Sequence, residues 1–91
     1  MYNIGIEFEY DQNKSGTNFT KHGLTFEDAK KLWFVENIYF DLRHKGERRL
    51  MIIGFLKGKC YSCIFTVRGA KIRIISVRRS REEEETRYRE K

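Results

Sequence analysis

The chain has 91 residues, enough for one small domain spanning 1–91, and 40% of them are hydrophobic, which is typical of a globular protein. A domain of this size buries only about 60% of the surface of its unfolded chain, and such a thin core excludes a large cofactor or a deep interior cavity. The net charge is +6, and residues 43–79 contain eleven Lys or Arg against a single acid, Glu47, which favours a polyanionic ligand such as nucleic acid.

Neither a targeting signal nor a membrane span is predicted. The first residues carry no basic stretch followed by an apolar stretch, so we expect no signal peptide. No apolar run approaches the length of a membrane helix. We therefore expect a cytoplasmic protein that has no membrane partner.

The chain begins with a predicted strand and helix. Residues 4–10 alternate apolar and polar side chains, which is typical of a strand. Asp11 is placed to cap the helix that follows, over 14–21. We expect this helix to end at Gly23, because glycine readily takes the left-handed conformation found there.

A second helix follows directly. Thr25 and Asp28 resemble a capping box in which Asp takes the place of the usual Glu. The spacing of Phe26, Trp33 and Phe34 places these aromatic side chains on one face of the helix. We expect that face to pack on a sheet.

The second half of the chain predicts a meander of strands. Strand-like segments follow one another at 38–42, 47–56, 60–67 and 71–77. Turns at Gly58 and Gly69 connect the last three, because glycine supplies the positive φ that a tight hairpin requires.

The C-terminal residues predict a last helix. Residues 80–83 read Ser-Arg-Glu-Glu, a capping box. Tyr88 is almost its only apolar side chain, and two i,i+4 ion pairs are expected to support it, Glu83–Arg87 and Glu85–Arg89. The order β-α-α-β-β-β-β-α predicts an α+β fold, in which two N-terminal helices pack on a small antiparallel sheet and a C-terminal helix completes the domain.

Cys60 and Cys63 form a Cys-x-x-Cys sequence inside a predicted strand. No second pair completes the four ligands of a structural zinc site. Positions three apart in a strand point to opposite faces, so neither a disulfide nor a shared metal fits easily. We expect two reduced thiols, no metal and no cofactor.

Short motifs follow one another in a fixed order along nearly the whole chain. They are Phe8-Glu9-Tyr10-Asp11, Lys14, Asn18, Lys21-His22-Gly23, Phe26-Glu27, Ala29, Asp41, His44, Glu47-Arg48-Arg49, Ile53-Gly54, Val67, Arg73-Ile74-Ile75-Ser76, Arg78-Arg79, Glu83 and Tyr88. In this order and spacing they resemble the BrnT family of bacterial toxins, the ribonuclease halves of type II toxin–antitoxin pairs. The chain departs from the family at Tyr10, where Trp is usual, at Val77, where Ala is common, and in a shorter, more basic loop at 44–47.

The resemblance implies a fold similar to RelE and a metal-independent ribonuclease that cleaves RNA and arrests translation. It also implies a cognate antitoxin. BrnT-like toxins pair with a ribbon-helix-helix antitoxin that dimerises, binds operator DNA and represses its own operon. We therefore expect a hetero-oligomer with a BrnA-like antitoxin, RNA as the substrate, and operator DNA reached only through the antitoxin.

Metal-independent cleavage of RNA needs a base for the 2′-OH, cations for the charge on the phosphorane and an acid for the leaving 5′-oxygen. Arg48 and Arg78 are our first candidates for phosphate ligands, because a planar guanidinium holds two oxygens at once. Arg73 is a further candidate. Strand alternation places Arg73 and Arg78 on opposite faces unless a bulge or the strand end intervenes. The alternative for each arginine is a solvated position or an ion pair with the antitoxin.

Three more residues are candidate acids or bases, each with a structural alternative. His22 can act as an acid or base near neutral pH or can pack at the end of a helix. Glu47 is a general base or the ion-pair partner of Arg48 or Arg49, and we favour the ion pair. Tyr88 is an acid, a stacking group or an apolar anchor, and we favour the anchor. The remaining cations are predicted to bind RNA: Lys21, Arg49, Lys57, Lys59, Arg68, Lys71 and Arg79.

Two other functions are compatible with the same residues. The first is a catalytically inactive nucleic-acid-binding or co-repressor module acting with the antitoxin, because attraction to phosphate needs no chemistry. Salt-dependent binding that leaves RNA intact favours it. The second is a basic face that only docks the antitoxin. In that case mutation of Arg78 weakens antitoxin binding and leaves toxicity unchanged.

Overall fold

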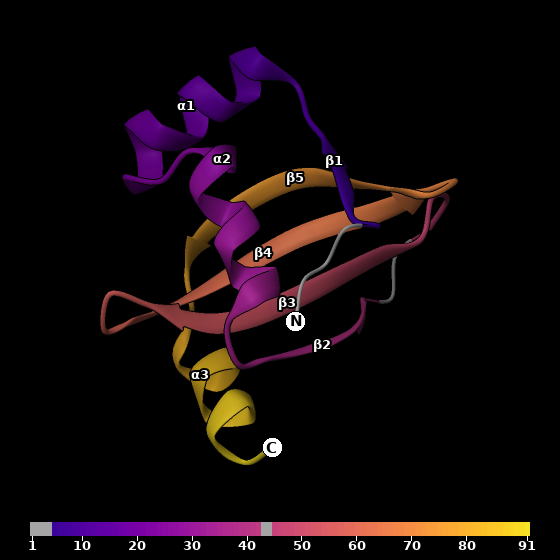
Figure 1. Cartoon of the computed structure of the whole chain (residues 1–91). Coiled ribbons are helices and arrows are strands. Elements are labelled where there is room, and N and C mark those ends of the chain that lie inside the picture. The colour runs from indigo at the N-terminus through magenta and orange to yellow at the C-terminus, as the bar shows by residue number, and fades with distance from the viewer. Residues whose placement is uncertain (1–4, 43–44) are drawn as a thin grey trace.

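Five strands form one sheet in the computed structural model, and helices pack on it (Figure 1). The structure describes residues 5–42 and 45–91, so Ile4 of the predicted first strand, Arg43 of the basic segment and His44 of the motifs lie outside the described residues. No helix within these ranges is long and apolar enough to cross a bilayer. The elements are β1 (Glu7–Glu9), α1 (Gln12–His22), α2 (Phe26–Ala29), the 3₁₀ helix η1 (Lys30–Phe34), β2 (Asn37–Leu42), β3 (Arg49–Leu56), β4 (Lys59–Arg68), β5 (Lys71–Arg79) and α3 (Glu82–Arg89).

The strands lie in the order β1-β5-β4-β3-β2. Strands β2 to β5 form an antiparallel meander, but β1 pairs with β5 in parallel, with Glu7 opposite Lys71 and Glu9 opposite Arg73. The prediction of an antiparallel sheet is therefore wrong for β1, and the sheet is mixed. Alternation within a strand shows which side chains are buried, but it does not encode the direction of the neighbouring strand. The α+β class and the order of the strands and helices are confirmed, and a RelE-like arrangement stays a prediction.

Both ends of α1 form as the sequence predicts. Asp11 Oδ1 accepts hydrogen bonds from the amides of Asn13 and Lys14, at 2.8 and 3.2 Å, and so satisfies two donors that the first turn leaves open. Gly23 ends the helix in the left-handed conformation, with φ 79°. Its amide donates to the carbonyl of Phe19 at 2.8 Å.

The second helix begins as predicted and then tightens. Thr25 and Asp28 form the capping box, with each backbone amide 3.1 Å from the other side chain. The α-helix lasts only to Ala29 and continues as η1. Because a 3₁₀ helix turns about 120° per residue rather than about 100°, its last residues rotate away from the expected face. Phe26 is buried, but Phe34 is 54% exposed, so the prediction that Phe34 packs on the sheet is wrong.

Two hydrophobic clusters lie on opposite faces of the sheet. On the α2 face, the cluster contains Phe26, Ala29, Leu32, Leu50, Ile52, Cys63, Phe65, Ile74 and Val77. On the α3 face, Tyr88 of α3 packs against a cluster of Met51, Ile53 and Cys60. Cys60 and Cys63 thus point to opposite faces, as predicted, and both are free thiols. Burial raises the pKa of the Cys63 thiol.

Strand β5 contains a one-residue bulge at Ile75. Ile74 pairs with Phe65 and Ser76 pairs with Ile64, the next residue of β4, so Ile75 has no opposite residue. An extra residue of this kind shifts the in-and-out alternation by one position for the rest of the strand.

The bulge determines which face carries the arginines of β5. Arg73 pairs with Thr66 and Arg78 pairs with Ser62, four residues away in β4, so both arginines lie on the same face. Ile74 and Val77, three residues apart, both stay in the cluster of the α2 face. Strict alternation therefore does not hold, and the bulge that we considered as an alternative is present.

Helix α3 begins one residue later than predicted. The residue before its first turn is Arg81, whose amide donates to Glu84 Oε1 at 2.9 Å, so the predicted capping box at 80–83 is wrong by one position. Any of four consecutive glutamates can supply the acid, and the sequence alone does not fix which one does. The predicted pair between Glu85 and Arg89 is confirmed, at 2.6 Å.

Aromatic contacts hold the rest of α3 on the sheet. The Tyr88 ring lies 5.4 Å from the ring of Phe55, centroid to centroid, which is the predicted anchor contact. Arg87 does not form the predicted pair with Glu83. Its guanidinium carbon lies 3.6 Å from the centroid of the Phe40 ring, a cation–π contact that also covers apolar surface.

Asn18 joins α1 to the open edge of β5. Its Nδ2 donates to the carbonyls of Val77 and Leu24, both at 2.8 Å, and its Oδ1 accepts from the amide of Val77 at 3.1 Å. The short β1 pairs only with Lys71 to Arg73, so this edge of β5 has no neighbouring strand at Val77. The Asn18 side chain makes the hydrogen bonds that such a strand would make there. It satisfies three backbone groups that would otherwise be left without partners.

Replacing Asn18 with Leu, which has a similar size, is expected to lower the free energy of unfolding by about 3 kcal/mol, because the buried groups of Val77 and Leu24 lose their partners. Urea unfolding followed by circular dichroism measures this change. The control is Thr17→Ala, at an exposed position of the same helix, which is expected to change stability by less than about 0.5 kcal/mol. Equal stability of the two variants would contradict the role given to Asn18.

Candidate active site

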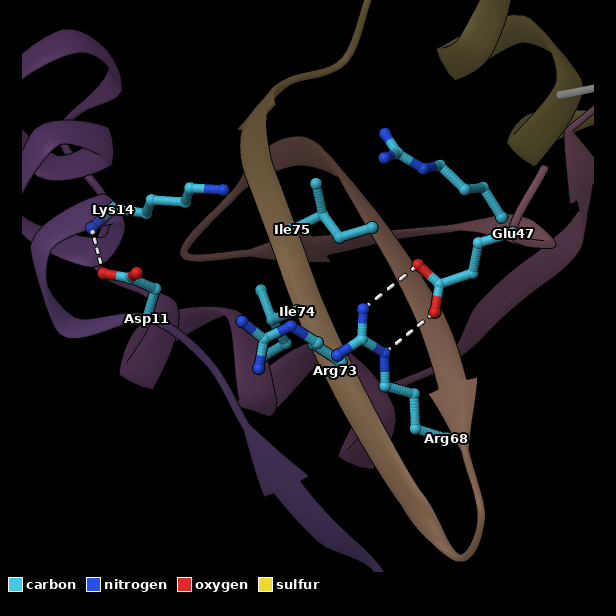
Figure 2. Close-up of a pocket in the computed structure, with 8 residues that line it drawn as sticks. Asp11, Lys14, Glu47, Arg68, Arg73, Ile74 and Ile75 are labelled. Atoms are coloured by element: carbon cyan, nitrogen blue, oxygen red, sulfur yellow. Dashed lines mark hydrogen bonds and ion pairs between the residues drawn. The ribbon is translucent and has the colours of Figure 1, made fainter. Parts of the chain in front are cut away.

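A pocket of about 150 Å³ lies beside β5, between the start of α1, the start of β3 and the end of β4 (Figure 2). Four cationic and two acidic side chains line it, an excess of two positive charges. Four residues predicted as site residues meet here from separate parts of the chain. We call it the Arg73 pocket, and its lining is Asp11, Lys14, Glu47, Arg49, Arg68, Arg73, Ile74 and Ile75.

Glu47 is the carboxylate at the centre of these cations. Arg68 donates to it from Nε at 2.8 Å and from Nη2 at 3.3 Å. The hydrogen bond from Arg68 is the main cause that lowers the pKa of the Glu47 carboxyl, and the charges of Arg49 and Arg73 lower it further. The ion pair that we favoured for Glu47 exists, but the predicted partners, Arg48 or Arg49, are wrong. Pairing across two strand ends is invisible to local sequence.

The other cations of the pocket are less completely paired. Arg73 Nη1 lies 3.4 Å from Glu9 Oε2, a long contact between side chains that are each about one third exposed. Arg49 Nε is buried, and no hydrogen-bond partner for it lies within residues 5–42 and 45–91. Lys14 extends from α1 toward β5 (Figure 2). Donors without acceptors in a small basic pocket are what an anionic ligand satisfies.

The fold places an acid and a cation on either side of Arg73. Asp11 and Lys14 lie on one side of β5, and Glu47 and Arg68 lie on the other (Figure 2). The cap at Asp11 fixes the first turn of α1, and with it Lys14. The bulge in β5 fixes the face on which Arg73 lies. The pocket therefore depends on two local features rather than on packing of its own residues.

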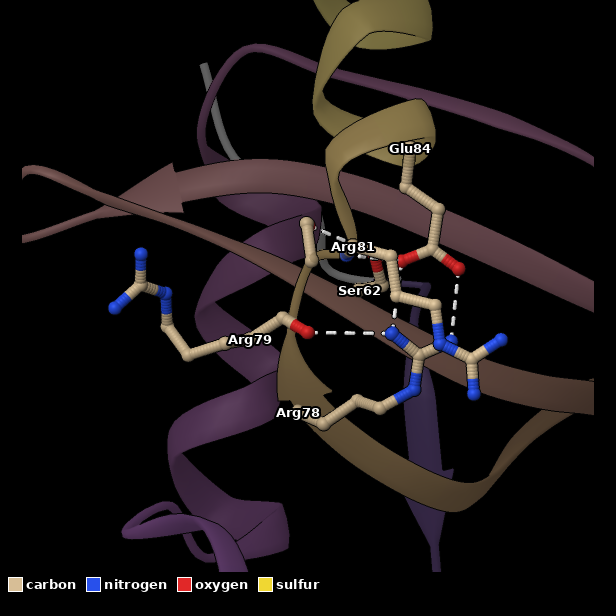
Figure 3. Close-up of polar contacts among 6 residues, drawn as sticks. Ser62, Arg78, Arg79, Arg81 and Glu84 are labelled. Carbon is tan, nitrogen blue, oxygen red and sulfur yellow. Dashed lines mark hydrogen bonds and ion pairs between the residues drawn. The ribbon is translucent and has the colours of Figure 1, made fainter.

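Arg78 lies in a second group of polar side chains, at the far end of β5 (Figure 3). Its two terminal nitrogens each donate to one oxygen of Glu84, both at 2.8 Å. Ser62 and the amide of Arg81 also donate to Glu84, both at 2.9 Å. Burial alone raises the pKa of the Glu84 carboxyl, but the hydrogen bonds from Arg78, the Arg81 amide and Ser62 outweigh it and lower that pKa to about 2. This pair holds α3 against the sheet.

An open cleft of about 380 Å³ adjoins this pair, where the end of α1, the end of β5 and the start of α3 meet. It brings together four further predicted site residues. Arg79 points away from the pair formed by Arg78 and Glu84 (Figure 3), and its guanidinium carbon lies 5.9 Å from the centroid of the Tyr61 ring. We call this the Arg78 cleft, and its lining is Lys21, His22, Arg78, Arg79 and Arg81.

The remaining predicted site residues lie apart from both. Arg48 donates to both carboxylate oxygens of Asp41, at 2.6 and 3.0 Å, on an exposed part of the sheet. Arg48 and Arg78 are two strands and about five residues apart, roughly 19 Å, so the structure does not bring these two candidates together at one phosphate. Tyr88 of α3 packs on the sheet, and its hydroxyl donates to the carbonyl of Glu36 at 3.4 Å. Lys57 and Lys59 lie at the turn between β3 and β4, and Lys71 lies at the turn between β4 and β5.

Sequence reasoning did not name Lys14, Arg81 or Glu84 as site residues. Lys14 is noted as a motif residue and as the beginning of a helix, although it lies seven residues before Lys21 and therefore on the same side of α1. Glu84 is hidden in a run of four glutamates. To choose Glu84 from this run, one would need to know how far the start of α3 lies from Arg78.

The pair of Arg78 and Glu84 makes stability depend on acid pH. The ordinary pKa of the Glu84 carboxyl is 4.5, and its pKa in the folded protein is about 2. Between these values the unfolded chain binds a proton that the folded chain does not, so stability is complete above about pH 5 and falls toward pH 2, by roughly 2–3 kcal/mol. Glu84→Gln removes this component.

Urea unfolding at a series of pH values measures the effect. We expect wild type and Glu84→Gln to differ most above about pH 5 and to converge toward pH 2. The matched control is Glu83→Gln, at an exposed neighbouring position. A difference between wild type and Glu84→Gln that is the same at both ends of the range would contradict the assignment.

Comparison with protein families adds an independent finding. The model of the family described as "Ribonuclease toxin, BrnT, of type II toxin-antitoxin system" matches residues 10–84, most of the chain. The matched segment contains the Arg73 pocket and the pair of Arg78 and Glu84. The resemblance drawn from the ordered motifs is therefore confirmed. No curated protein matches the chain.

Proposed function

The chain belongs to the BrnT family of ribonuclease toxins of type II toxin–antitoxin systems, and from this premise we propose that it is a metal-independent endoribonuclease whose active site is the Arg73 pocket. One observation carries the choice of site. The Glu47 carboxylate, its pKa lowered by the surrounding arginines, borders a small pocket that carries an excess of positive charge. A base and several cations at one phosphate are the groups that cleavage of this kind requires.

The proposed reaction uses the two sides of the pocket. Glu47 accepts the proton of the 2′-OH, the 2′-oxygen bonds to phosphorus, and the bond from phosphorus to the 5′-oxygen breaks. Lys14 donates a proton to the leaving 5′-oxygen. The products are a 2′,3′-cyclic phosphate and a 5′-hydroxyl. In-line displacement requires base and acid on opposite sides of the phosphorus, and Glu47 and Lys14 lie on opposite sides of β5 (Figure 2).

Electrostatic stabilisation is expected to exceed the contribution of the base. The hydrogen bond from Arg68 keeps Glu47 ionised, but a lowered pKa also makes it a weak base. Each preorganised donor aimed at developing charge contributes about 10²–10³-fold to the rate. Arg49 and Arg73 have N–H groups that can still donate hydrogen bonds to a phosphate, because Arg49 Nε has no partner in the described residues and Arg73 has only a long contact with Glu9. Their positive charge also repels a divalent cation, which supports a metal-independent route.

The Arg78 cleft supports catalysis less well. Glu84 occupies both terminal nitrogens of Arg78 with hydrogen bonds, so this guanidinium has little capacity for a phosphate. No carboxylate lines the cleft in the described part of the chain. His22 is exposed there and has no described group that orients its ring. An imidazole that is free to rotate is a poor general base.

The family implies a protein antitoxin. We propose that this partner is a BrnA-like ribbon-helix-helix protein that forms a hetero-oligomer with the chain and carries it to operator DNA. Free toxin in the cytoplasm then cleaves RNA and inhibits translation. We expect expression of the chain alone to arrest growth and co-expression of the antitoxin to restore it. Full growth with soluble, folded protein would contradict toxicity for this chain.

A second candidate function is RNA binding without cleavage. The observation that favours it is the two-point hydrogen bond between Glu47 and Arg68, which holds the proposed base of the pocket in an ion pair. A protein of this kind would bind RNA through the same cations and act with the antitoxin as a co-repressor.

Arg73→Ala is expected to lower kcat/KM for RNA cleavage about 10²–10³-fold, because it removes a donor to the phosphorane. Glu47→Gln is expected to cost less, about 10²-fold, because the carboxylate is a weak base. Both are measured on a single-stranded RNA in buffer containing EDTA. The wild-type products are expected to end in a 2′,3′-cyclic phosphate, and a substrate with 2′-deoxyribose at the cleaved position is expected to resist.

Two controls separate the outcomes. Lys31→Ala, an exposed position outside both basic sites, is expected to cleave at the wild-type rate. Arg73→Lys keeps the charge and tests whether the planar guanidinium is needed, and urea unfolding of each variant tests folding. Intact RNA with wild-type protein, together with salt-dependent binding, would reject cleavage in favour of the second candidate.

A further inference from the structure

We propose that the Arg78 cleft binds a second phosphate of the same RNA strand and so positions single-stranded RNA across the Arg73 pocket. The role in catalysis rests on the proposed function of that pocket. The ligand class is a phosphodiester backbone, recognised by charge and spacing rather than by base sequence.

The two basic sites lie along one seam between α1 and β5. Residues at the start of α1 and in the middle of β5 line the Arg73 pocket, and residues at the end of each line the Arg78 cleft. Lys14 and Lys21 are seven residues apart, close to two helical turns, so both lie on the same side of α1 with a separation of about 10 Å along its axis. Each contributes to one of the two sites.

Strand β5 lies on the other side of the seam from α1, and it also contributes residues to both sites. It contributes Arg73 to the Arg73 pocket and Arg78 to the Arg78 cleft, and the bulge at Ile75 leaves these two arginines on one face of the sheet. Asn18 lies between them and bonds α1 to β5, which fixes the distance from one site to the other. Grooves of this kind hold a strand only a few nucleotides long, about 4 or more.

The Arg78 cleft has positive charge to offer a phosphate. The ion pairs within residues 5–42 and 45–91 include none of Lys21, Arg79 and Arg81. The end of α1 contributes a partial negative charge of about 0.5, which opposes an anion. Three full positive charges exceed it, so the cleft attracts phosphate.

The lining favours RNA over a protein partner. Every side chain that lines the cleft is cationic or imidazole. The centre of a protein interface is instead enriched in aromatic and other apolar side chains and depleted of charge. Grooves that follow a single nucleic-acid strand are lined by positive charge.

The test compares a dinucleotide with an eight-nucleotide RNA for the double variant Lys21→Ala and Arg81→Ala. We expect KM for the longer RNA to rise about tenfold with kcat unchanged, because the hydrogen bonds to one charged phosphate are lost. Kinetics on the dinucleotide, which has a single phosphate, are expected to stay at wild-type values. The matched control is Lys31→Ala with Lys91→Ala, which removes the same charge at positions away from the seam.

A binding experiment decides the proposal even if the wild-type protein cleaves nothing. Fluorescence anisotropy with a 2′-O-methyl eight-nucleotide RNA gives the slope of log K against log salt. For the double variant Lys21→Ala and Arg81→Ala, the magnitude of this negative slope is expected to be smaller than for the control by about 0.7. That is the value for one phosphate contact on a single strand. An unchanged slope and unchanged KM would overturn the proposal. Loss of antitoxin binding with unchanged RNA binding would also overturn it and assign the cleft to a protein.

Discussion

The extra residue in β5, Ile75, is the constraint on which the site and the core both depend. With it, Ile74 and Val77 stay together under α2 while Arg73 and Arg78 stay together on the other face. Without it, one of the two arginines would lie in the apolar cluster under α2. An unpaired guanidinium there costs several kcal/mol, so the bulge is required for stability as much as for the arrangement of charge.

The arginines of the basic segment, residues 43–79, differ in whether a carboxylate pairs with them. Arg48 and Arg78 each form a two-point pair with a carboxylate, and their positive charge is cancelled where they lie. Arg49 and Arg73 have no such pairing within the described residues. A net charge counted along the sequence therefore overstates the field that a ligand meets. The two sites along the seam between α1 and β5 keep more cationic than acidic side chains in their lining.

The sequence predicts the elements well because caps and alternation are local. Asp11, Gly23 and the pair of Thr25 and Asp28 form as expected, since each acts on a residue within four positions. The direction of β1, the bulge at Ile75 and the partners of the arginines could not be predicted, since each depends on residues that are beyond one helical turn or in another strand. The family resemblance supplied the chemistry, but only the three-dimensional arrangement shows which cations share a pocket.

Helix α1 is attached by hydrogen bonds rather than by apolar packing. Its buried residues are Ser15 and Asn18, and its one large apolar side chain, Phe19, is 55% exposed. Ser15 Oγ accepts from the amide of Phe26 at 2.9 Å, and Asn18 bonds the edge of β5. Hydrogen bonds are directional, whereas apolar contacts tolerate rotation, so these bonds fix the helix about its own axis. The fixed orientation of α1 directs Lys14 and Lys21 toward the seam. The polar attachment of α1 therefore determines where the positive charge lies.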